Sequence, residues 1–184
     1  MILSKIDILG FKSFARKTEL RFDGRITAVV GPNGCGKTNI VDALRWGLGE
    51  QRYSVLRADR MENVIFGGAQ SSRPLGMAEV SLTFDNSAHL LPIDYKEVII
   101  TRRLYRSGES EYLLNKSQVR LKDVHDLIMD TGIGTGMYSV IELKMVEDII
   151  SEKAEDRRKL IEEAARVTQY KHRHKAAIRK REAT

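Results

Sequence analysis

The chain has 184 residues, of which 42% are hydrophobic and 30% are charged, and its formal net charge is +6. A chain of this length can form one globular domain that buries about 70% of its unfolded surface. Cys35 is the single cysteine, so an intrachain disulfide is excluded. Charged residues near the start break the apolar core that a signal peptide would need, and no apolar run approaches transmembrane length. We therefore expect a cytosolic protein that does not contact a membrane.

The first elements in chain order are predicted to be strands. Apolar and polar residues alternate in 2–11 and again in 18–22, with a turn between them at 10–14 that carries a lysine and a serine. The next run, 25–30, is short, apolar and β-branched, which predicts a buried parallel strand.

Residues 31–39 read Gly-Pro-Asn-Gly-Cys-Gly-Lys-Thr-Asn and complete the phosphate-loop pattern G-x-x-x-x-G-K-[ST]. After the loop, Ile40, Leu44 and Leu48 recur at helical spacing, and glycines at 47 and 49 are expected to end the helix. Strand, glycine loop and helix stand in the order that phosphate binding requires. This setting argues against a glycine-rich turn followed by a chance Lys-Thr pair.

Each residue type in the loop has a physical role. Glycines allow positive φ and bring backbone N–H groups close to phosphate oxygens, and the helix N-terminus adds partial positive charge. Lys37 would reach the β- and γ-phosphates, and the Thr38 hydroxyl would be a ligand of Mg²⁺. Cys35 occupies a variable position of the pattern, where a small residue simply fits. The sequence therefore predicts a site for a nucleoside triphosphate.

Further strands are predicted around 80–84, 98–105 and 112–114, followed by a helix with Ser117 as its N-cap that ends before Gly132. The last segment, 152–184, holds 11 Lys and Arg against 6 Asp and Glu and contains neither Gly nor Pro. Its thin apolar stripe favours a coiled-coil arm, and a surface helix of a compact domain is the alternative.

A catalytic element that hydrolytic phosphate-loop enzymes usually carry is missing from the sequence. The Walker B element consists of several apolar residues that end in an aspartate near Mg²⁺. The nearest candidate, 127–130, is short and lies in a helical pattern. The chain therefore reads as half of an active site.

Several motifs in order resemble the N-terminal head segment of structural maintenance of chromosomes (SMC) proteins, of the bacterial or archaeal, condensin-like kind. The motifs are Gly10–Phe14, Gly31–Asn39, Ala43–Trp46 with Gly49–Gln51, Met61–Phe66, Asp130–Gly134 with Tyr138–Ser139, and Ile161–Ala165. The resemblance implies an α/β fold, the N-terminal lobe of an ABC-type phosphate-loop NTPase, with a mixed sheet around the phosphate-loop helix. It also implies that residues 1–151 form this lobe and that 152–184 begin the coiled-coil arm.

The resemblance implies roles for individual residues. ATP and Mg²⁺ would be the cofactors, with Thr38 on the metal, and Arg57 would be the arginine beside the nucleotide that supports turnover. Arg60, Arg120 and Lys122 resemble basic residues on a DNA-facing surface, although isolated basic residues are usually just solvated. The implied ATP site comprises Lys12, Ser13, Pro32, Asn33, Gly34, Cys35, Gly36, Lys37, Thr38 and Asn39.

The resemblance also implies partners. A C-terminal lobe of the same protein would supply Walker B and the signature motif, and a second head, in a homodimer, would enclose ATP. A kleisin subunit would bind the neck, where Ile161, Val167 and Ile178 are apolar. Double-stranded DNA would be entrapped for chromosome condensation and segregation in the nucleoid, with ATP hydrolysis only in the completed head. The alternatives are a DNA-repair ATPase with the same plan and a small-molecule kinase.

One segment departs from the family pattern. Where the family has Gly-Gln-Gly, this chain has Glu142-Leu143-Lys144. A leucine cannot bind a metal ion or hold a water molecule. Hydrolysis is impaired, or the loop is altered, or another residue such as Glu142 takes the role; the sequence leaves these three readings open.

Overall fold

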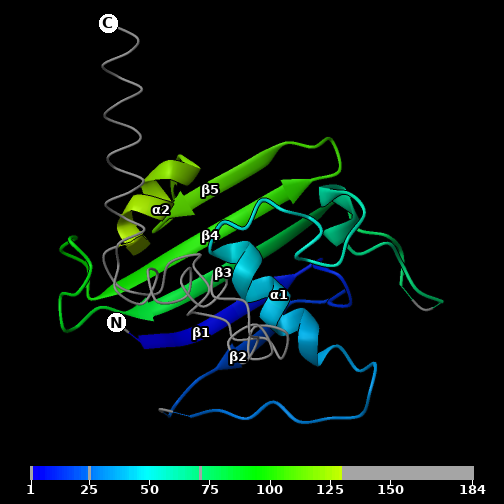
Figure 1. Ribbon diagram of the computed structural model, residues 1–184, viewed down its shortest axis with the longest axis horizontal. Helices are drawn as coiled ribbons and strands as arrows, with labels where there is room; N and C mark the ends of the chain where they lie inside the picture. The colour runs from blue at the N-terminus through cyan, green and yellow to red at the C-terminus, as the bar shows by residue number, and fades with distance from the viewer. Residues whose placement is uncertain (1, 25, 71, 130–184) are drawn as a thin grey trace, which may run out of the picture. The chain divides into compact units, whose positions relative to one another are not determined.

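The computed structural model describes residues 2–24, 26–70 and 72–129. Unit 1 of the chain, Met1–Thr131, contains all of them. The family segments at 130–139, 142–144 and 161–165, the boundary at 151 and the arm lie outside the described residues. The elements in chain order (Figure 1) are β1 (Ile2–Leu9), β2 (Thr18–Arg21), α1 (Lys37–Gly47), the 3-10 helix η1 (Met61–Val64), β3 (Met77–Asp85), β4 (Glu97–Tyr105), β5 (Ser110–Leu114), β6 (Ser117–Val119) and α2 (Leu121–Met129).

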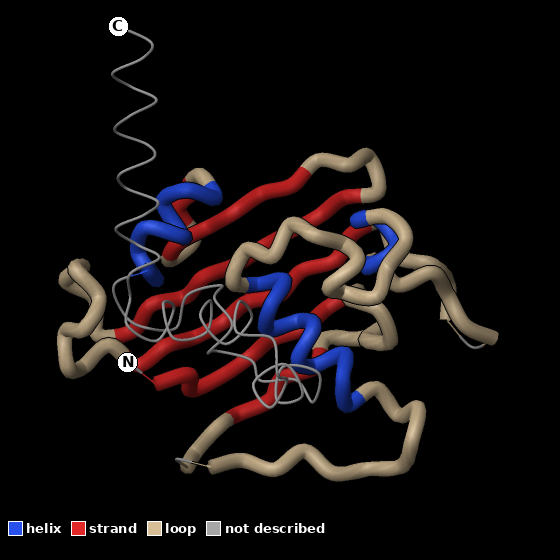
Figure 2. The backbone as a smooth tube through the Cα atoms, in the orientation of Figure 1, coloured by secondary structure: helices blue, strands red, loops and turns tan. Residues whose placement is uncertain are grey.

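The strands form one six-stranded sheet in the order β2-β1-β3-β4-β5-β6. Every one of these neighbouring pairs is antiparallel. Figure 2 shows the long strands side by side, with α1 lying across one face of the sheet. The alternation predicted from the sequence is therefore realised as one covered face and one more polar face.

The core lies between the sheet and α1. Trp46 is fully buried on α1 and its ring lies 5.2 Å from that of Phe11. Gly47 lets the helix approach the sheet closely, because a Cβ atom there would lie 3.0 Å from the Leu82 side chain. The strands contribute alternate residues to this core, including Ile6, Ile8, Val80, Leu82, Phe84, Val98, Ile100 and Leu104.

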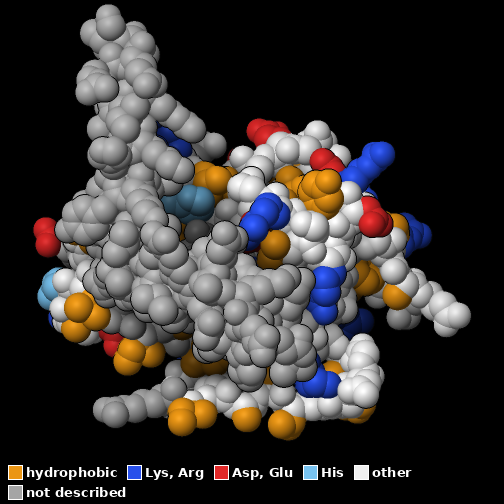
Figure 3. All heavy atoms as spheres, in the orientation of Figure 1, with side chains coloured by type: hydrophobic (Ala, Val, Ile, Leu, Met, Phe, Trp, Pro, Cys, Tyr) orange, Lys and Arg blue, Asp and Glu red, His pale blue; other side chains and the backbone are white. Residues whose placement is uncertain are grey.

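A strand is predicted at 25–30, but its described part, 26–30, does not form one. Residues 26–30 have no strand assignment, and Ile26 and Val30 are 93% and 87% exposed. A strand exists only through hydrogen bonds to a neighbour, and no strand among the described residues pairs with this segment. Figure 3 shows hydrophobic side chains on the surface in the region of this segment.

Two further expectations are corrected. Ser117 does not cap a helix, because it begins β6 after a turn in which Asn115 and Lys116 both have positive φ. Helix α2 begins at Leu121 instead. The Arg120 backbone N–H, just before the helix, donates to the Asp123 carboxylate at 2.9 Å, so this N–H group has a hydrogen-bond partner.

Of the three apolar residues at helical spacing, Leu48 is buried, but the buried face of α1 is centred away from Ile40 and Leu44. Ile40 and Leu44 are only half-buried, whereas Asp42, Ala43, Trp46 and Gly47 face the core. Small residues at 43 and 47 let the helix axis come near the sheet, and this proximity selects the face. Apolar spacing alone did not reveal it.

Gly49 joins α1 to the rest of the lobe, and we predict that Gly49→Ala destabilises the chain by about 2 kcal/mol or more. Its φ is +104°, and a Cβ atom would lie 2.5 Å from His125 Nε2 on α2. Gly67→Ala is the matched control, because nothing lies within 4 Å of a Cβ there and its φ is not positive. Urea unfolding of both variants checks the prediction, and equal midpoints would contradict it.

Candidate nucleotide-binding site

The phosphate loop passes directly into the N-terminus of α1. Gly36 is the N-cap with φ 101°, and no side chain caps the helix. Gly34 also has positive φ, and a side chain added there would meet nothing within 4 Å. First-turn N–H groups without a side-chain cap suit an anion, so this end of the helix fits a phosphate group.

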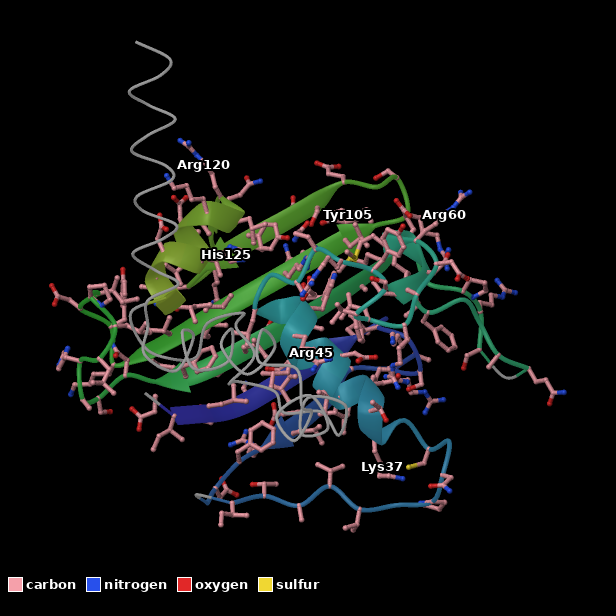
Figure 4. All side chains as sticks on the ribbon, viewed as in Figure 1. Lys37, Arg45, Arg60, Tyr105, Arg120 and His125 are labelled. Atoms are coloured by element: carbon pink, nitrogen blue, oxygen red, sulfur yellow. The ribbon has the colours of Figure 1, made fainter. Side chains whose placement is uncertain are left out.

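Lys37 lies across the loop that precedes it (Figure 4). Its ammonium group donates to the carbonyl oxygens of Gly31 at 2.7 Å and of Pro32 at 2.6 Å. These bonds hold the lysine beside the helix N-terminus and curve the loop around it. The remaining loop residues Pro32, Asn33, Gly34 and Cys35 are exposed, and Asn39 is partly exposed.

The 10–14 turn contacts the loop, as the resemblance implied. The Asn39 side-chain amide donates to the Ser13 hydroxyl oxygen at 2.9 Å, and this hydroxyl lies 2.9 Å from where a Cβ of Gly36 would stand. Backbone hydrogen bonds join the turn to the end of η1 and the residues just after it: Lys12 N–H donates to the Val64 oxygen, and Phe66 N–H donates to the Gly10 oxygen. Ser13 therefore lies against the start of α1, and Lys12 stays a predicted residue of the nucleotide site.

Arg57 and Lys12 meet at a third residue, Asp42 of α1. Lys12 Nζ and Arg57 Nη2 both donate to Oδ2 of Asp42, and Lys12 Nζ also donates to the Leu56 carbonyl oxygen. Asp42 is 2% exposed, whereas the Arg57 side chain is 52% exposed. Two cations share one buried carboxylate, so the cluster carries a net positive charge next to the phosphate loop.

Mg²⁺ fits the site only as a metal held jointly with phosphate. Within residues 2–24, 26–70 and 72–129, no group of three or more His, Cys, Asp or Glu side chains could hold an ion. Mg²⁺ commonly keeps several waters and binds through one or two protein oxygens and substrate phosphates. The exposed hydroxyl of Thr38, in the first turn of α1, is such an oxygen.

The three residues predicted to face DNA are all exposed, but they do not form one cluster. Figure 4 places Arg60 and Arg120 well apart, near η1 and near the start of α2 respectively. Lys122 lies in the first turn of α2, close to Arg120 in the chain. On the visible described part of the face in Figure 3, Lys and Arg side chains are dispersed.

Two buried charged residues escaped the sequence analysis. Asp42 stands within an apolar helical pattern, and this interruption was a signal that could have been used. Arg102 on β4 is 1% exposed and donates to the carbonyl oxygens of Trp46 at 3.0 Å and Glu50 at 2.7 Å, at the end of α1. Burial lowers its pKa to about 10, so the guanidinium group is still charged at neutral pH.

Comparison with known proteins agrees with this geometry. Residues 2–147 match the family model of the RecF/RecN/SMC N terminal domain. The chromosome partition protein Smc of Chlorobaculum tepidum is 57% identical over 183 residues, which is 100% of this chain and 16% of that protein. The chain therefore spans about one sixth of the length of this relative.

Solved structures show the same fold. A structure described as "Structural biochemistry of ATP-driven dimerization and DNA stimulated activation of SMC ATPases" is 33% identical with a TM-score of 0.81, covering 87% of this chain and 97% of that one. The Smc head domain of Pyrococcus furiosus, with an extended coiled coil and bound to the C-terminal domain of ScpA, is 32% identical with a TM-score of 0.82. That match covers 97% of this chain and 45% of the other. Because the family model covers most of the chain and its relatives match it from end to end, the chain belongs to the RecF/RecN/SMC N-terminal domain family, as the N-terminal head segment of an SMC protein with the ABC-type phosphate-loop fold.

Proposed function

We propose that this chain is the ATP-binding lobe of a split ABC-type head that hydrolyses ATP only when a C-terminal lobe and a second head complete it. The observation that carries the proposal is the uncapped N-terminus of α1, with Lys37 bound across the preceding loop. Membership in a family of ATPase heads supports ATP as the ligand. The lobe boundary near residue 151 and the arm beyond it belong to the same proposal.

The exposed segment 26–30 supports the split. Its apolar side chains lie at the surface directly before the phosphate loop, and Ile40 and Leu44 of the following helix are half-buried. An apolar, β-branched segment of this kind is suited to the middle of a sheet. A second lobe that supplies a neighbouring strand would bury it and bring a Walker B carboxylate to the loop.

In the completed site, this chain's residues would bind and orient the triphosphate. The N–H groups at the start of α1 and the Lys37 ammonium would hold its phosphates, and Ser13 and Lys12 would line the same side. Mg²⁺, held in part by Thr38, would neutralise charge on the phosphate oxygens. Arg57 would stabilise the charge that develops during phosphoryl transfer.

The wider role follows from the relatives and is proposed for the whole protein. The head would pair with a second copy, bind a kleisin subunit at its neck and act on double-stranded DNA during chromosome condensation and segregation in the nucleoid. Arg60, Arg120 and Lys122 would contact DNA phosphates without sequence preference. Among the described residues, no helix has the length and apolar character that a membrane crossing requires.

Phosphate release from Mg-ATP tests the proposal, measured for this chain alone and mixed with the C-terminal lobe of the same protein. We expect release only in the mixture. Release by the chain alone would contradict the split head and favour a kinase-like enzyme. No release in either sample, with ATP still bound, would contradict the catalytic part and direct attention to Leu143.

A further inference from the structure

Asp42 lies at the point where three segments of the site meet. The residue belongs to α1, immediately after the phosphate loop, and its carboxylate oxygen accepts from Lys12 in the 10–14 turn and from Arg57 in the 52–58 loop. Lys12 also donates to the carbonyl oxygen of Leu56, the residue before Arg57. The helix, the turn and the loop are thus joined through one buried acid.

The backbone adds evidence that this arrangement is specified. Lys12 has φ 48° and Arg57 has φ 52°, both in the left-handed region. This region is sterically unfavourable for a residue that is not glycine, and strained backbone of this kind clusters at functional sites. Both cations that reach Asp42 are held in this conformation.

We propose that Asp42 is a positioning residue that holds Lys12 and Arg57 beside the phosphate loop in the geometry needed for ATP turnover. The inference rests on the proposed function. Arg57 keeps about half of its side chain exposed, so it remains able to contact a ligand while Asp42 fixes its direction. Lys37 is held separately, by the carbonyl oxygens of Gly31 and Pro32, so phosphate binding by the loop does not depend on Asp42.

Asp42 holds Lys12 and Arg57, whereas loop carbonyl oxygens hold Lys37, and this separation predicts how kcat and KM change when Asp42 is replaced. A misplaced cation weakens stabilisation of the charge that develops in the transition state, and a small displacement can cost a large factor in rate. For Asp42→Asn in the completed head, we expect kcat to fall about tenfold or more, while KM for Mg-ATP changes less than about threefold. The amide keeps the size of the side chain and removes its charge.

A matched control is available at the other end of α1. Glu50 pairs with Arg52 at 3.2 Å, so Glu50→Gln makes the same chemical change in an acid–arginine pair without touching Lys12 or Arg57. Its kcat should stay within about twofold of the wild type. Trypsin cleavage after Arg57 should be faster in Asp42→Asn than in Glu50→Gln, because the 52–58 loop has lost its attachment.

A double-mutant cycle separates positioning from a purely structural role. If Asp42 acts through Arg57 and Lys12, then Asp42→Asn should lower kcat by a clearly smaller factor in an Arg57→Ala background than in the wild type, because only Lys12 is left to be misplaced. Additive losses would overturn the proposal, as would a wild-type kcat in the single variant. A general loss of stability would lower the activity of both backgrounds by the same factor, so the cycle distinguishes it.

The single variant leaves the Lys12 ammonium partly buried without its carboxylate, which could unfold the chain. Asp42→Asn combined with Lys12→Met removes that ammonium, and its kcat is compared with that of Lys12→Met alone. We expect Asp42→Asn to lower kcat in this background too, by a smaller factor than in the wild type, because Arg57 alone is left to be misplaced. Equal kcat values for the double variant and Lys12→Met would overturn the proposal. Binding of a fluorescent ATP analogue by the wild type is measured first: no binding would count against the proposed function, whereas binding with no effect of Asp42→Asn counts against this inference alone.

Discussion

Lys37→Ala is expected to lower ATP turnover by the completed head at least about 100-fold and to weaken ATP binding. The ammonium group lies at the start of α1 beside the first-turn N–H groups and donates to carbonyl oxygens of the loop. Phosphate release and binding of a fluorescent ATP analogue measure the two effects. The bonds that Lys37 makes are exposed, so the free energy of unfolding should change by less than about 1 kcal/mol.

Lys96→Ala is the control for this variant. Lys96 is an exposed lysine just before β4, so its removal changes the net charge equally without touching the loop. Turnover by Lys96→Ala should equal that of the wild type. Equal losses in the two variants would mean that general charge, not the position of Lys37, governs nucleotide binding.

Arg102→Ala is expected to lower the free energy of unfolding by about 3–5 kcal/mol. The guanidinium group satisfies two carbonyl oxygens at the end of α1, and it lies 4.6 Å from the centre of the Trp46 ring and 5.1 Å from that of Tyr112. Truncation leaves both carbonyl groups without this partner and opens a cavity between helix and sheet. Urea unfolding at neutral pH, where Arg102 is charged, measures the loss.

Arg103→Ala provides the comparison, because Arg103 is the next residue on the same strand and points to the opposite face of the sheet. Its side chain is 34% exposed and pairs with Glu79 and Glu111. Pairs of this kind usually contribute about 1 kcal/mol or less. If both variants lost the same stability, burial of Arg102 against the end of α1 would not be the cause.

Much of the site could be predicted because its chemistry is local in sequence. The phosphate loop needs consecutive glycines, a lysine and a threonine, and the helix that follows begins and ends where the pattern predicts. Alternation of apolar and polar residues likewise predicts the antiparallel strands, and β3, β4 and β5 lie at the positions that show it. The family resemblance rested on the same local motifs.

The residues that escaped prediction depend on partners distant in the chain. Asp42 reaches residues 30 positions before it and 15 after it, and Arg102 reaches a helix end more than 50 positions away. A charged residue can interrupt an apolar pattern, as Asp42 does, but the sequence does not identify its partners, and its contribution to stability depends on those partners. The strand prediction for 26–30 was wrong for a related reason: a strand forms only when a neighbouring strand accepts and donates its backbone hydrogen bonds, and no described strand pairs with this segment.

An extended segment with free backbone groups is also a template for any other extended chain. If a C-terminal lobe completes the head, as proposed above, this chain would leave the ribosome before that lobe is made, and Ile26, Val29 and Val30 would stay exposed during the interval. Arg25 on one side and Gly31-Pro32 on the other limit the run to five residues. A run this short would limit pairing with other extended chains during that interval.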